Sequence, residues 1–403
     1  MAELPQYRFT PAFEAPAGSA IRELFKYLSR PGMISFAGGY PPPVLFDQPG
    51  LAAAADRAFS AAPVDCLQYA ATEGLPMLRE QLQTLMARRG CAVALDELMV
   101  TTGSQQGLDL LVKVLLAPGD AVLVERPTYP ATLQALRLAG CELAGVSTDA
   151  AGLDTEALAA HLAGQPRGRY RLLYCVPSFA NPTGACLPLA RRLALLALAA
   201  EHDFLIVEDD PYGALRFAGE PVPSLLALQA HVPGALGRVI HLSSLSKVVA
   251  PGLRVGWMAA PLPVRQRCAI AKQTVDLCTS PWAQRIAAEY LADGALDRHL
   301  PVLVAGYRAK AERMLKGLAG LADRLEVAPP QGGMFVWGRC RHGVVARDLF
   351  ERAVAHDVLF VPGTAFFCDQ ADPGSVRLSF AAPGLEEIDE GLRRLGRAFE
   401  GGG

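Results

Sequence analysis

Lys247 and Arg254, seven residues apart, are the pair of side chains whose types and spacing are most suggestive of chemistry in this sequence. The lysine follows the apolar run 239–242 and the hydroxyl residues Ser244 and Ser246. A lysine in this setting can bind an aldehyde cofactor covalently and later move protons. The arginine is suited to the phosphate of such a cofactor. Taken alone, the segment could also be a surface lysine after a strand.

Two more polar residues follow apolar runs that are typical of strands. Ser104 comes after the run 98–101 and opens a helical pattern, where exposed backbone N–H groups could hold a phosphate. Its alternative role is to cap that helix. Tyr129 follows the run 121–124 and could place its ring against an aromatic cofactor, or could be an ordinary core tyrosine.

Amide, carboxylate and phenol groups follow the next two apolar runs. Asn181 lies in a turn after the run 172–176, and its side-chain amide could donate a hydrogen bond to a phenolate oxygen. Asp209 ends the run that begins at 204 and could pair with a cationic ring nitrogen. It could equally cap the next helix. Tyr212, three residues further on, could reach a neighbouring oxygen.

A single arginine, Arg377, interrupts the apolar run 376–380 near the C-terminus. A buried arginine needs a partner, and its planar fork matches a carboxylate with two hydrogen bonds. That carboxylate could belong to a substrate or to a structural ion pair, and the sequence leaves both open.

The order of the expected elements predicts an α/β fold. From about residue 50 to 280, helical patterns alternate with apolar runs, which indicates right-handed βαβ units and a large doubly wound, mostly parallel sheet. Such sheets bind ligands at the carboxyl ends of their strands, where the residues above lie. We therefore expect an N-terminal arm and lid segment (1–45), a large domain (46–280) and a smaller α+β domain (281–403). The expected helices span 104–116, 130–139, 154–163, 188–202, 282–293, 297–321, 346–356 and 385–398.

The composition argues against several classes of function. The 403 residues include 38 Lys and Arg against 40 Asp and Glu, which gives no reason to expect nucleic acid or an anionic membrane as a partner. The longest uncharged apolar run, 193–200, is too short to cross a bilayer, and the N-terminus shows no secretion signal. Nine scattered cysteines and dispersed histidines predict a cytoplasmic protein without a disulfide framework or metal site.

These segments together resemble pyridoxal-phosphate-dependent aminotransferases of fold type I, in the large class I/II family. The resemblance is strongest to the 2-aminoadipate/aromatic aminotransferase branch. The resemblance to the family covers about residues 15–398. The resemblance to this branch depends on five segments, residues 19–24, 35–39, 69–74, 329–337 and 361–363. It implies the transfer of an amino group between an L-amino acid and a 2-oxo acid, with 2-oxoglutarate and glutamate expected as one pair. It also implies a homodimer with shared active sites.

The resemblance assigns a role to each matching position. Lys247, Asp209 and Tyr212 match the catalytic residues: the cofactor-bound lysine, the partner of the ring nitrogen, and a contact of the phenolic oxygen. The positions that match cofactor-binding residues are Ser104, Gln105, Tyr129, Asn181, Asp209, Tyr212, Ser244, Ser246, Lys247, Arg254 and Tyr69. Tyr69 matches a tyrosine that reaches the phosphate of the neighbouring subunit's cofactor. The substrate positions are Arg377, which matches the residue that holds the α-carboxylate, with Gly39, Asn181 and Arg22.

Some points stay open at this level. Arg22 is expected on a movable helix over the side-chain pocket, but a surface arginine is the alternative. Ala180 and Ala185 replace a glutamine and an arginine that are common in the branch, which weakens the inference of a substrate. The same residues could support elimination or decarboxylation. A ligand-sensing regulator would require a DNA-binding module before Phe36, and the stretch before it is not basic.

Overall fold

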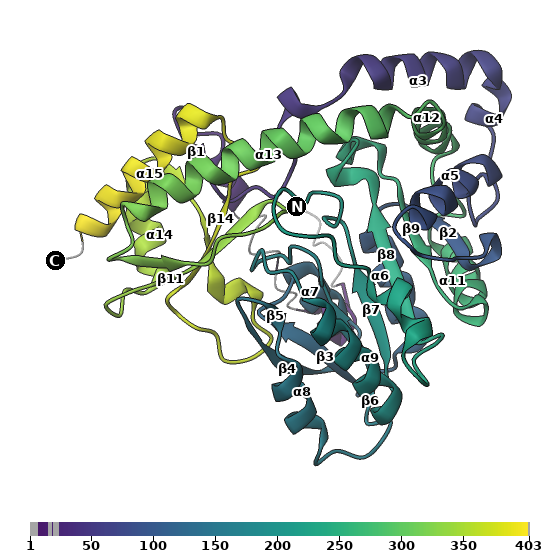
Figure 1. Cartoon of the computed structure of the whole chain (residues 1–403), viewed down its shortest axis with the longest axis horizontal. Helices are drawn as coiled ribbons and strands as arrows, with labels where there is room; N and C mark the ends of the chain where they lie inside the picture. The colour runs from purple at the N-terminus through teal and green to yellow at the C-terminus, as the bar shows by residue number, and fades with distance from the viewer. Residues whose placement is uncertain (1–6, 15–17, 19–23, 402–403) are drawn as a thin grey trace, which may run out of the picture.

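Two sheets of different size organise the chain (Figure 1). The computed structural model describes residues 7–14, 18 and 24–401. The larger sheet has eight strands in the order β2-β9-β8-β7-β6-β3-β4-β5. In that order their bounds are β2 (Leu98–Thr101), β9 (Gly256–Ala259), β8 (Val239–Ser244), β7 (Leu205–Asp209), β6 (Tyr170–Cys175), β3 (Ala121–Arg126), β4 (Glu142–Asp149) and β5 (Gly152–Leu153).

The middle of this sheet is parallel, from β8 through β7, β6 and β3 to β4. The residues of β8 are all buried, as are most of those of β7, β6 and β3, because helices cover both faces and leave largely apolar strands between them. The predicted α/β fold with a mostly parallel sheet is confirmed. Three strands of this sheet were not predicted: β4, of whose eight residues only one is fully buried, the two-residue β5 that pairs with it, and β9, which runs antiparallel to both of its neighbours.

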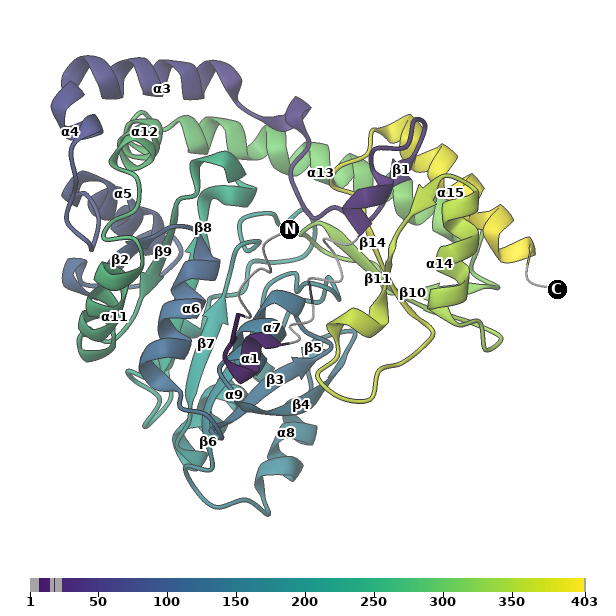
Figure 2. The ribbon, with the colours of Figure 1, turned by 180° about the vertical axis from the view of Figure 1, so that it is seen from behind.

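Helices lie on both faces of the larger sheet (Figures 1 and 2). On one face α6 packs into the core cluster that contains Tyr174 and Leu242, and on the other α9 packs with Leu173 and Val239. The helices around this sheet are α3 (Gln48–Ala61), α4 (Pro63–Leu67), α5 (Pro76–Ala87), α6 (Ser104–Leu115), α7 (Pro130–Leu138), α8 (Thr155–Leu162), α9 (Leu189–His202), α10 (Leu225–Leu228), α11 (Leu262–Val275) and α12 (Pro281–Ala292). Those that were expected individually agree with the structure to within two residues.

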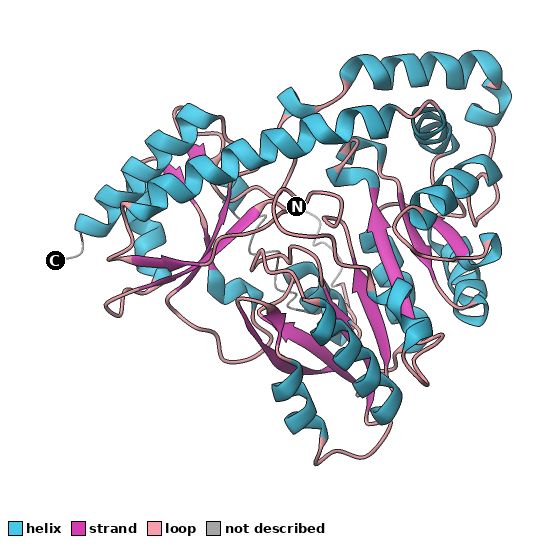
Figure 3. Ribbon diagram, viewed as in Figure 1, coloured by secondary structure: helices cyan, strands magenta, loops and turns pink. Residues whose placement is uncertain are grey.

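The C-terminal part forms an α+β layer, as expected (Figure 3). The long helix α13 (Ala295–Ala319) extends from the larger sheet to the smaller one (Figure 1). The smaller sheet is antiparallel, in the order β10 (Leu325–Val327), β11 (Phe335–Cys340), β14 (Ser375–Ser379) and β13 (Val361–Pro362). The helices α14 (Ala346–Ala355) and α15 (Leu385–Glu400) pack on each other beside it.

The N-terminal segment joins this C-terminal part through a short parallel ladder. Strand β1 (Ile34–Ser35) pairs with β12 (Val358–Leu359). Of the helix expected in the N-terminal arm, the structure describes a single 3₁₀ turn, Leu24–Tyr27; Arg22 lies outside the described residues. In the described part of the chain, no helix has both the length and the apolar character needed to cross a membrane.

Candidate active site

A cavity of about 250 Å³ lies where the larger sheet meets the C-terminal part. The carboxyl ends of parallel strands meet at one edge of a sheet, so the residues that follow them gather there. The predicted residues that line the cavity are Gly39, Ser104, Gln105, Tyr129, Asn181, Asp209, Tyr212, Ser244, Ser246, Lys247, Arg254 and Arg377. Tyr69 is not among the lining residues; 78% of it is exposed on this single chain.

One end of the cavity is shaped by the unpredicted strand β9. Gly256 pairs with Thr101 of β2 on one side and with Ser244 of β8 on the other. A Cβ at Gly256 would lie 2.7 Å from the backbone nitrogen of Ser104, so only glycine allows the loop before α6 to approach this closely. Ser104 is the first residue of the 12-residue helix α6, and Gly103 holds the N-cap position without a side-chain cap. Ser104 therefore does not cap the helix, and the helix N-terminus faces the cavity as an anion site.

Arg254 and two serine hydroxyl groups lie at the same end. The guanidinium of Arg254 donates to Ser246 Oγ at 3.4 Å and to the Thr102 carbonyl at 3.3 Å. These distances are long for N–H···O bonds, so the guanidinium keeps capacity for an anion. Ser244 Oγ donates to Ser246 Oγ at 2.7 Å, which places both hydroxyl groups side by side. Together these groups have the chemistry of a phosphate site.

Gly103→Ala is expected to weaken the binding of a phosphate-bearing cofactor by about 10-fold or more. Gly103 has a φ of 81°, and a Cβ there would overlap Arg254 Nη2. The substitution therefore displaces the guanidinium as well as straining the backbone, which by itself costs about 1–3 kcal/mol of stability. Equilibrium binding of pyridoxal phosphate to the apo-protein measures the change.

Gly119→Ala is the matched control for this experiment. Its φ is 89°, and a Cβ there would meet nothing within 4 Å. The control should lose a similar amount of thermal stability and keep its cofactor affinity. If both variants lost affinity equally, the loss would come from backbone strain and not from Arg254.

The amine of Lys247 points into the cavity and is not a surface group. Its Nζ donates to the Gly39 carbonyl at 2.8 Å. Burial, helped by the nearby cations of Arg254 and Arg377, lowers the pKa of Lys247 to about 8. An amine with this pKa is neutral much more often near pH 7 than an ordinary lysine, so it is a better nucleophile and base.

Asp209 lies at the end of β7, opposite this amine, and does not cap a helix. Its Oδ2 accepts a 2.7 Å hydrogen bond from the hydroxyl of Tyr174, whereas its Oδ1 is buried and has no partner among the residues that the structure describes. Burial raises the pKa of Asp209 to about 6, and the hydrogen bond from Tyr174 opposes that rise. A buried carboxylate oxygen without a hydrogen bond destabilises the folded protein. A ligand that donates a hydrogen bond to Oδ1 of Asp209 would remove this cost.

Arg377 enters the cavity from β14 with only 1% of its surface exposed. Its Nη1 donates to Asn181 Oδ1 at 2.7 Å and its Nη2 to the Ala37 carbonyl at 2.6 Å. Its Nε is buried, and none of the described residues accepts a hydrogen bond from it. Among the described residues no carboxylate forms an ion pair with Arg377, and desolvation lowers the pKa of the guanidinium to about 10. A buried cation without a counter-ion favours a ligand carboxylate over a structural ion pair.

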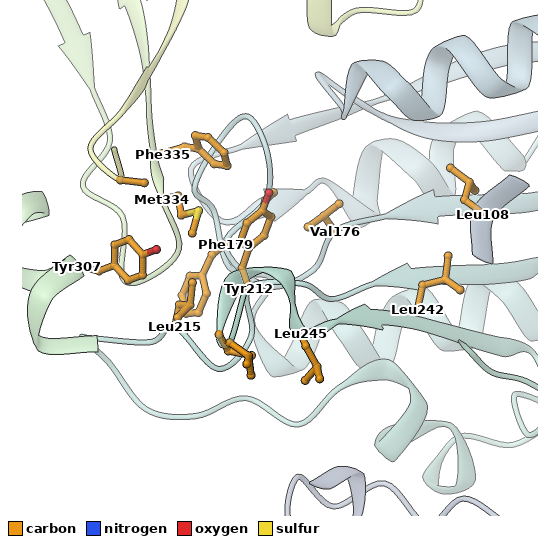
Figure 4. Close-up of a cluster of buried hydrophobic side chains, with 14 of the residues drawn as sticks. Leu108, Val176, Phe179, Tyr212, Leu215, Leu242, Leu245, Tyr307, Met334 and Phe335 are labelled. Carbon is orange, nitrogen blue, oxygen red and sulfur yellow. The ribbon is translucent and has the colours of Figure 1, made fainter. Parts of the chain in front are cut away.

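Aromatic rings lie beside the guanidinium of Arg377. The ring of Phe335 lies against the guanidinium, with 4.4 Å between the ring centre and Arg377 Cζ. It also meets Tyr212 edge-on at 5.8 Å, and Figure 4 shows both side chains near Phe179. Burial raises the pKa of Tyr212, and a hydrogen bond with Asn181 opposes that rise. Tyr212 therefore stays protonated and can donate its hydroxyl proton to an oxygen.

Several lining residues were not identified from the sequence. Gly103, Leu108, Thr132, Tyr174, Val176, Pro211, Pro251 and Phe335 also line the cavity. Tyr174 had a signal that could have been used. It is a polar ring inside an apolar strand, two residues before Val176, and residues two apart share one face of a strand.

These residues fit pyridoxal phosphate, the cofactor expected from the resemblance. The end formed by Ser104, Ser244 and Arg254 suits its phosphate. The unpartnered oxygen of Asp209 suits its protonated ring nitrogen, and the amine of Lys247 suits its aldehyde. Each reactive part of the cofactor has a matching group in the cavity.

Comparison with known proteins gives a consistent result. The model of the family described as "Aminotransferase class I and II" matches residues 46–395. The chain is 42% identical over 386 residues to the 2-aminoadipate transaminase of Thermus thermophilus, with 95% of this chain and 94% of that protein covered. It is 38% identical over 386 residues to aromatic-amino-acid aminotransferase 1 of Thermococcus litoralis, covering 95% and 91%.

A solved structure is similar over the same length. The α-aminoadipate aminotransferase of Thermus thermophilus, complexed with N-(5'-phosphopyridoxyl)-L-leucine, superposes with a TM-score of 0.89 at 40% identity. The alignment covers 98% of this chain and 97% of that one. Family, relatives and fold thus agree with the chemistry of the cavity, and the chain belongs to the class I and II aminotransferases, enzymes that work with pyridoxal phosphate.

Proposed function

We propose that this cavity transfers an amino group from an L-amino acid to a 2-oxo acid by a ping-pong reaction, with 2-oxoglutarate and glutamate as one pair. One observation carries the proposal. Three groups meet in one cavity of about 250 Å³: an amine of lowered pKa (Lys247), a carboxylate (Asp209) and a buried arginine (Arg377). Among the described residues, one oxygen of that carboxylate has no partner and the arginine has no counter-ion.

Each group has a distinct task in this reaction. Pyridoxal phosphate supplies the aldehyde that takes up the amino group and the ring that withdraws electrons from the Cα–H bond. Lys247 holds the cofactor between turnovers, and its Nζ then carries the proton away from the substrate Cα. Asp209 would pair with the ring nitrogen of the bound cofactor, and its negative charge would favour the protonated form of that nitrogen. Tyr129 covers the face of the ring, and the end formed by Ser104, Ser244 and Arg254 holds the phosphate.

The substrate is oriented by its carboxylate. Arg377 binds it with Nε and Nη groups, and Asn181 and Gly39 lie beside it. Fixing the carboxylate orients the Cα–H bond toward the amine of Lys247, which lowers the entropic cost of reaching the reactive geometry. Because only the carboxylate and amino group are fixed, the donor and the acceptor can have different side chains.

For the substrate class, we propose aromatic and long-chain acidic amino acids. The relatives at 42% and 38% identity are named for 2-aminoadipate and for aromatic amino acids. The part of the pocket described here offers the ring of Phe335 beside Arg377, which suits an apolar side chain. Arg22, expected to pair with acidic side chains, lies outside the described residues, and its role stays a prediction.

A series of amino-acid donors, with 2-oxoglutarate as the acceptor, tests the proposal. Purified protein loaded with pyridoxal phosphate is incubated with phenylalanine, 2-aminoadipate or leucine, with and without 2-oxoglutarate. We expect glutamate to form only when both a donor and 2-oxoglutarate are present. Release of ammonia or carbon dioxide without 2-oxoglutarate would instead indicate elimination or decarboxylation, the alternative reactions of the same residues.

We also propose that the enzyme is a homodimer in which Tyr69 serves the neighbouring site. Tyr69 is 78% exposed, and Leu67 and Val64 beside it are 77% and 71% exposed. Clustered exposed apolar side chains of this kind are typical of a protein interface. Their position on and after α4, away from this chain's own cavity, supports a role in a partner subunit.

A mixed dimer tests this arrangement. Lys247→Ala and Tyr69→Ala chains are each expected to be nearly inactive, but co-expression should restore about one quarter of the wild-type activity. The reason is that half of the random dimers are hybrids, and each hybrid has one site with an intact Lys247 and the partner's intact Tyr69. Activity no higher than that of the parents would show that Tyr69 acts within its own subunit. Full activity of Tyr69→Ala alone would also contradict the proposal.

We propose the division into an arm (1–45), a large domain (46–280) and a small domain (281–403). The ladder between β1 and β12 supports an arm that belongs with the small domain. The antiparallel sheet, which lies wholly after residue 320, supports a separate C-terminal unit. The cavity would then lie between the domains, where a closing movement could exclude water.

A further inference from the structure

Tyr174 is a buried residue to which neither the resemblance nor the comparisons assign a role. It lies in the middle of the larger sheet, in β6, and 0% of it is exposed. In the parallel ladder Tyr174 pairs with Val207, two residues before Asp209. Residues two apart point to the same face of a strand, so the Tyr174 ring extends toward the carboxylate at the end of the neighbouring strand.

The contact between the two side chains has a fixed direction. Tyr174 Oη lies 2.7 Å from Asp209 Oδ2, and an ionised carboxylate only accepts hydrogen bonds, so the tyrosine is the donor. Burial raises the pKa of Tyr174 well above its usual value, which keeps its proton in place. The other oxygen, Oδ1, is buried and has no partner in the described part of the chain, and Asp209 lines the cavity. One oxygen is thus occupied by the protein, and the other is left for a ligand.

We propose that Tyr174 is a positioning residue of this aminotransferase: its hydrogen bond to Oδ2 holds Asp209 ionised and turned so that Oδ1 meets the ring nitrogen of the cofactor. This inference depends on the proposed role of Asp209. The Tyr174 hydroxyl stabilises the charged form of Asp209 and so offsets part of the cost of burying it. Without this hydroxyl, the Asp209 carboxylate would be less stable in its ionised form and free to rotate. Asp209 would then be a weaker partner for a cationic nitrogen.

Binding of two cofactors to the apo-protein tests the proposal without any turnover. One is pyridoxal phosphate, and the other is its deaza analogue, in which CH replaces the ring nitrogen and cannot bond to Asp209. Tyr174→Phe should bind pyridoxal phosphate about 10-fold or more weakly than the wild type, as expected for loss of a hydrogen bond to a charged group. Its affinity for the deaza analogue should change by less than about 2-fold, because the Asp209 contact is absent there.

Tyr170→Phe is the matched control, since it removes the same atom from the same strand. Tyr170 Oη contacts His161 Nε2 at 2.5 Å, and its ring packs in the core cluster on the α9 face of the sheet. This variant should bind both cofactors like the wild type. As a second variant, Tyr174→fluorotyrosine keeps the ring and a hydroxyl donor, and should bind pyridoxal phosphate within about 2-fold of the wild type.

The outcomes separate this inference from the proposed function. If the wild type did not prefer pyridoxal phosphate over the deaza analogue, the proposed role of Asp209 itself would fail. If the wild type showed that preference but Tyr174→Phe kept it, the inference about Tyr174 would be wrong. Two outcomes would mean that Tyr174 only supports packing. In the first, Tyr174→Phe loses equal affinity for both cofactors. In the second, the fluorotyrosine variant loses as much affinity for pyridoxal phosphate as Tyr174→Phe does.

Discussion

Lys247→Ala is expected to reduce kcat by roughly 10³–10⁴-fold or more, the range for loss of a positioned acid or base together with its covalent bond. The alanine variant should still bind pyridoxal phosphate, because Arg254, Ser104 and Asp209 remain, but without covalent attachment. Borohydride reduction followed by peptide mapping should label the peptide that contains Lys247 in the wild type and leave the variant unlabelled. Single-turnover kinetics with a good donor measure the loss in rate.

The matched control is Lys113→Ala. Lys113 is a half-exposed lysine of α6 that pairs with Asp109, and its removal should leave the rate unchanged. A wild-type protein labelled by borohydride elsewhere would contradict the assignment of Lys247.

The pKa of Lys247 adds a prediction for the wild-type apo-protein. Covalent attachment requires the neutral amine, and the pKa of Lys247 is lowered to about 8. The rate of attachment should therefore rise with pH and level off above about pH 8, whereas an ordinary lysine would level off only above its usual pKa of about 10.4.

Arg377→Lys is expected to lower kcat/KM for the amino-acid donor by about 10²–10³-fold. The lysine keeps a positive charge but cannot make the two parallel hydrogen bonds of a guanidinium to a carboxylate. It would also leave Asn181 Oδ1 and the Ala37 carbonyl without their present donor. Breaking a buried charged contact costs about 2–5 kcal/mol, and the expected 10²–10³-fold loss, about 3–4 kcal/mol, lies in the middle of that range.

A second substrate distinguishes the loss of the contact with the substrate carboxylate from a structural defect in Arg377→Lys. With a decarboxylated analogue of the same donor, Arg377→Lys and the wild type should react at similar rates, because the contact with the carboxylate is missing in both. The control is Arg339→Lys in the adjacent strand β11, where the side chain is 71% exposed and pairs with Asp372. If Arg377→Lys lost as much with the analogue as with the amino acid, Arg377 would have a structural role only.

The sequence was sufficient to predict the elements with a strong local pattern. The parallel strands β3, β6, β7 and β8 were expected because a strand buried on both faces is a continuous apolar run. Strand β9 (Gly256–Ala259) was missed because it begins with glycine and ends with alanine, both of which are depleted in strands, and contains no β-branched residue. That omission matters, because Gly256 is the residue that brings the loop before α6 against the end of β8.

The sequence by itself determined the chemistry: an amine, a carboxylate and a phenol at or after the ends of expected strands, one guanidinium seven residues beyond the amine, and a second guanidinium within a C-terminal strand. The tertiary structure decided what each of them contacts. Arg377 meets Asn181 across 196 residues, and Tyr174 meets Asp209 across 35. Local spacing reports only on neighbours within a few residues, whereas these contacts follow from strand order and register, which only long-range packing establishes.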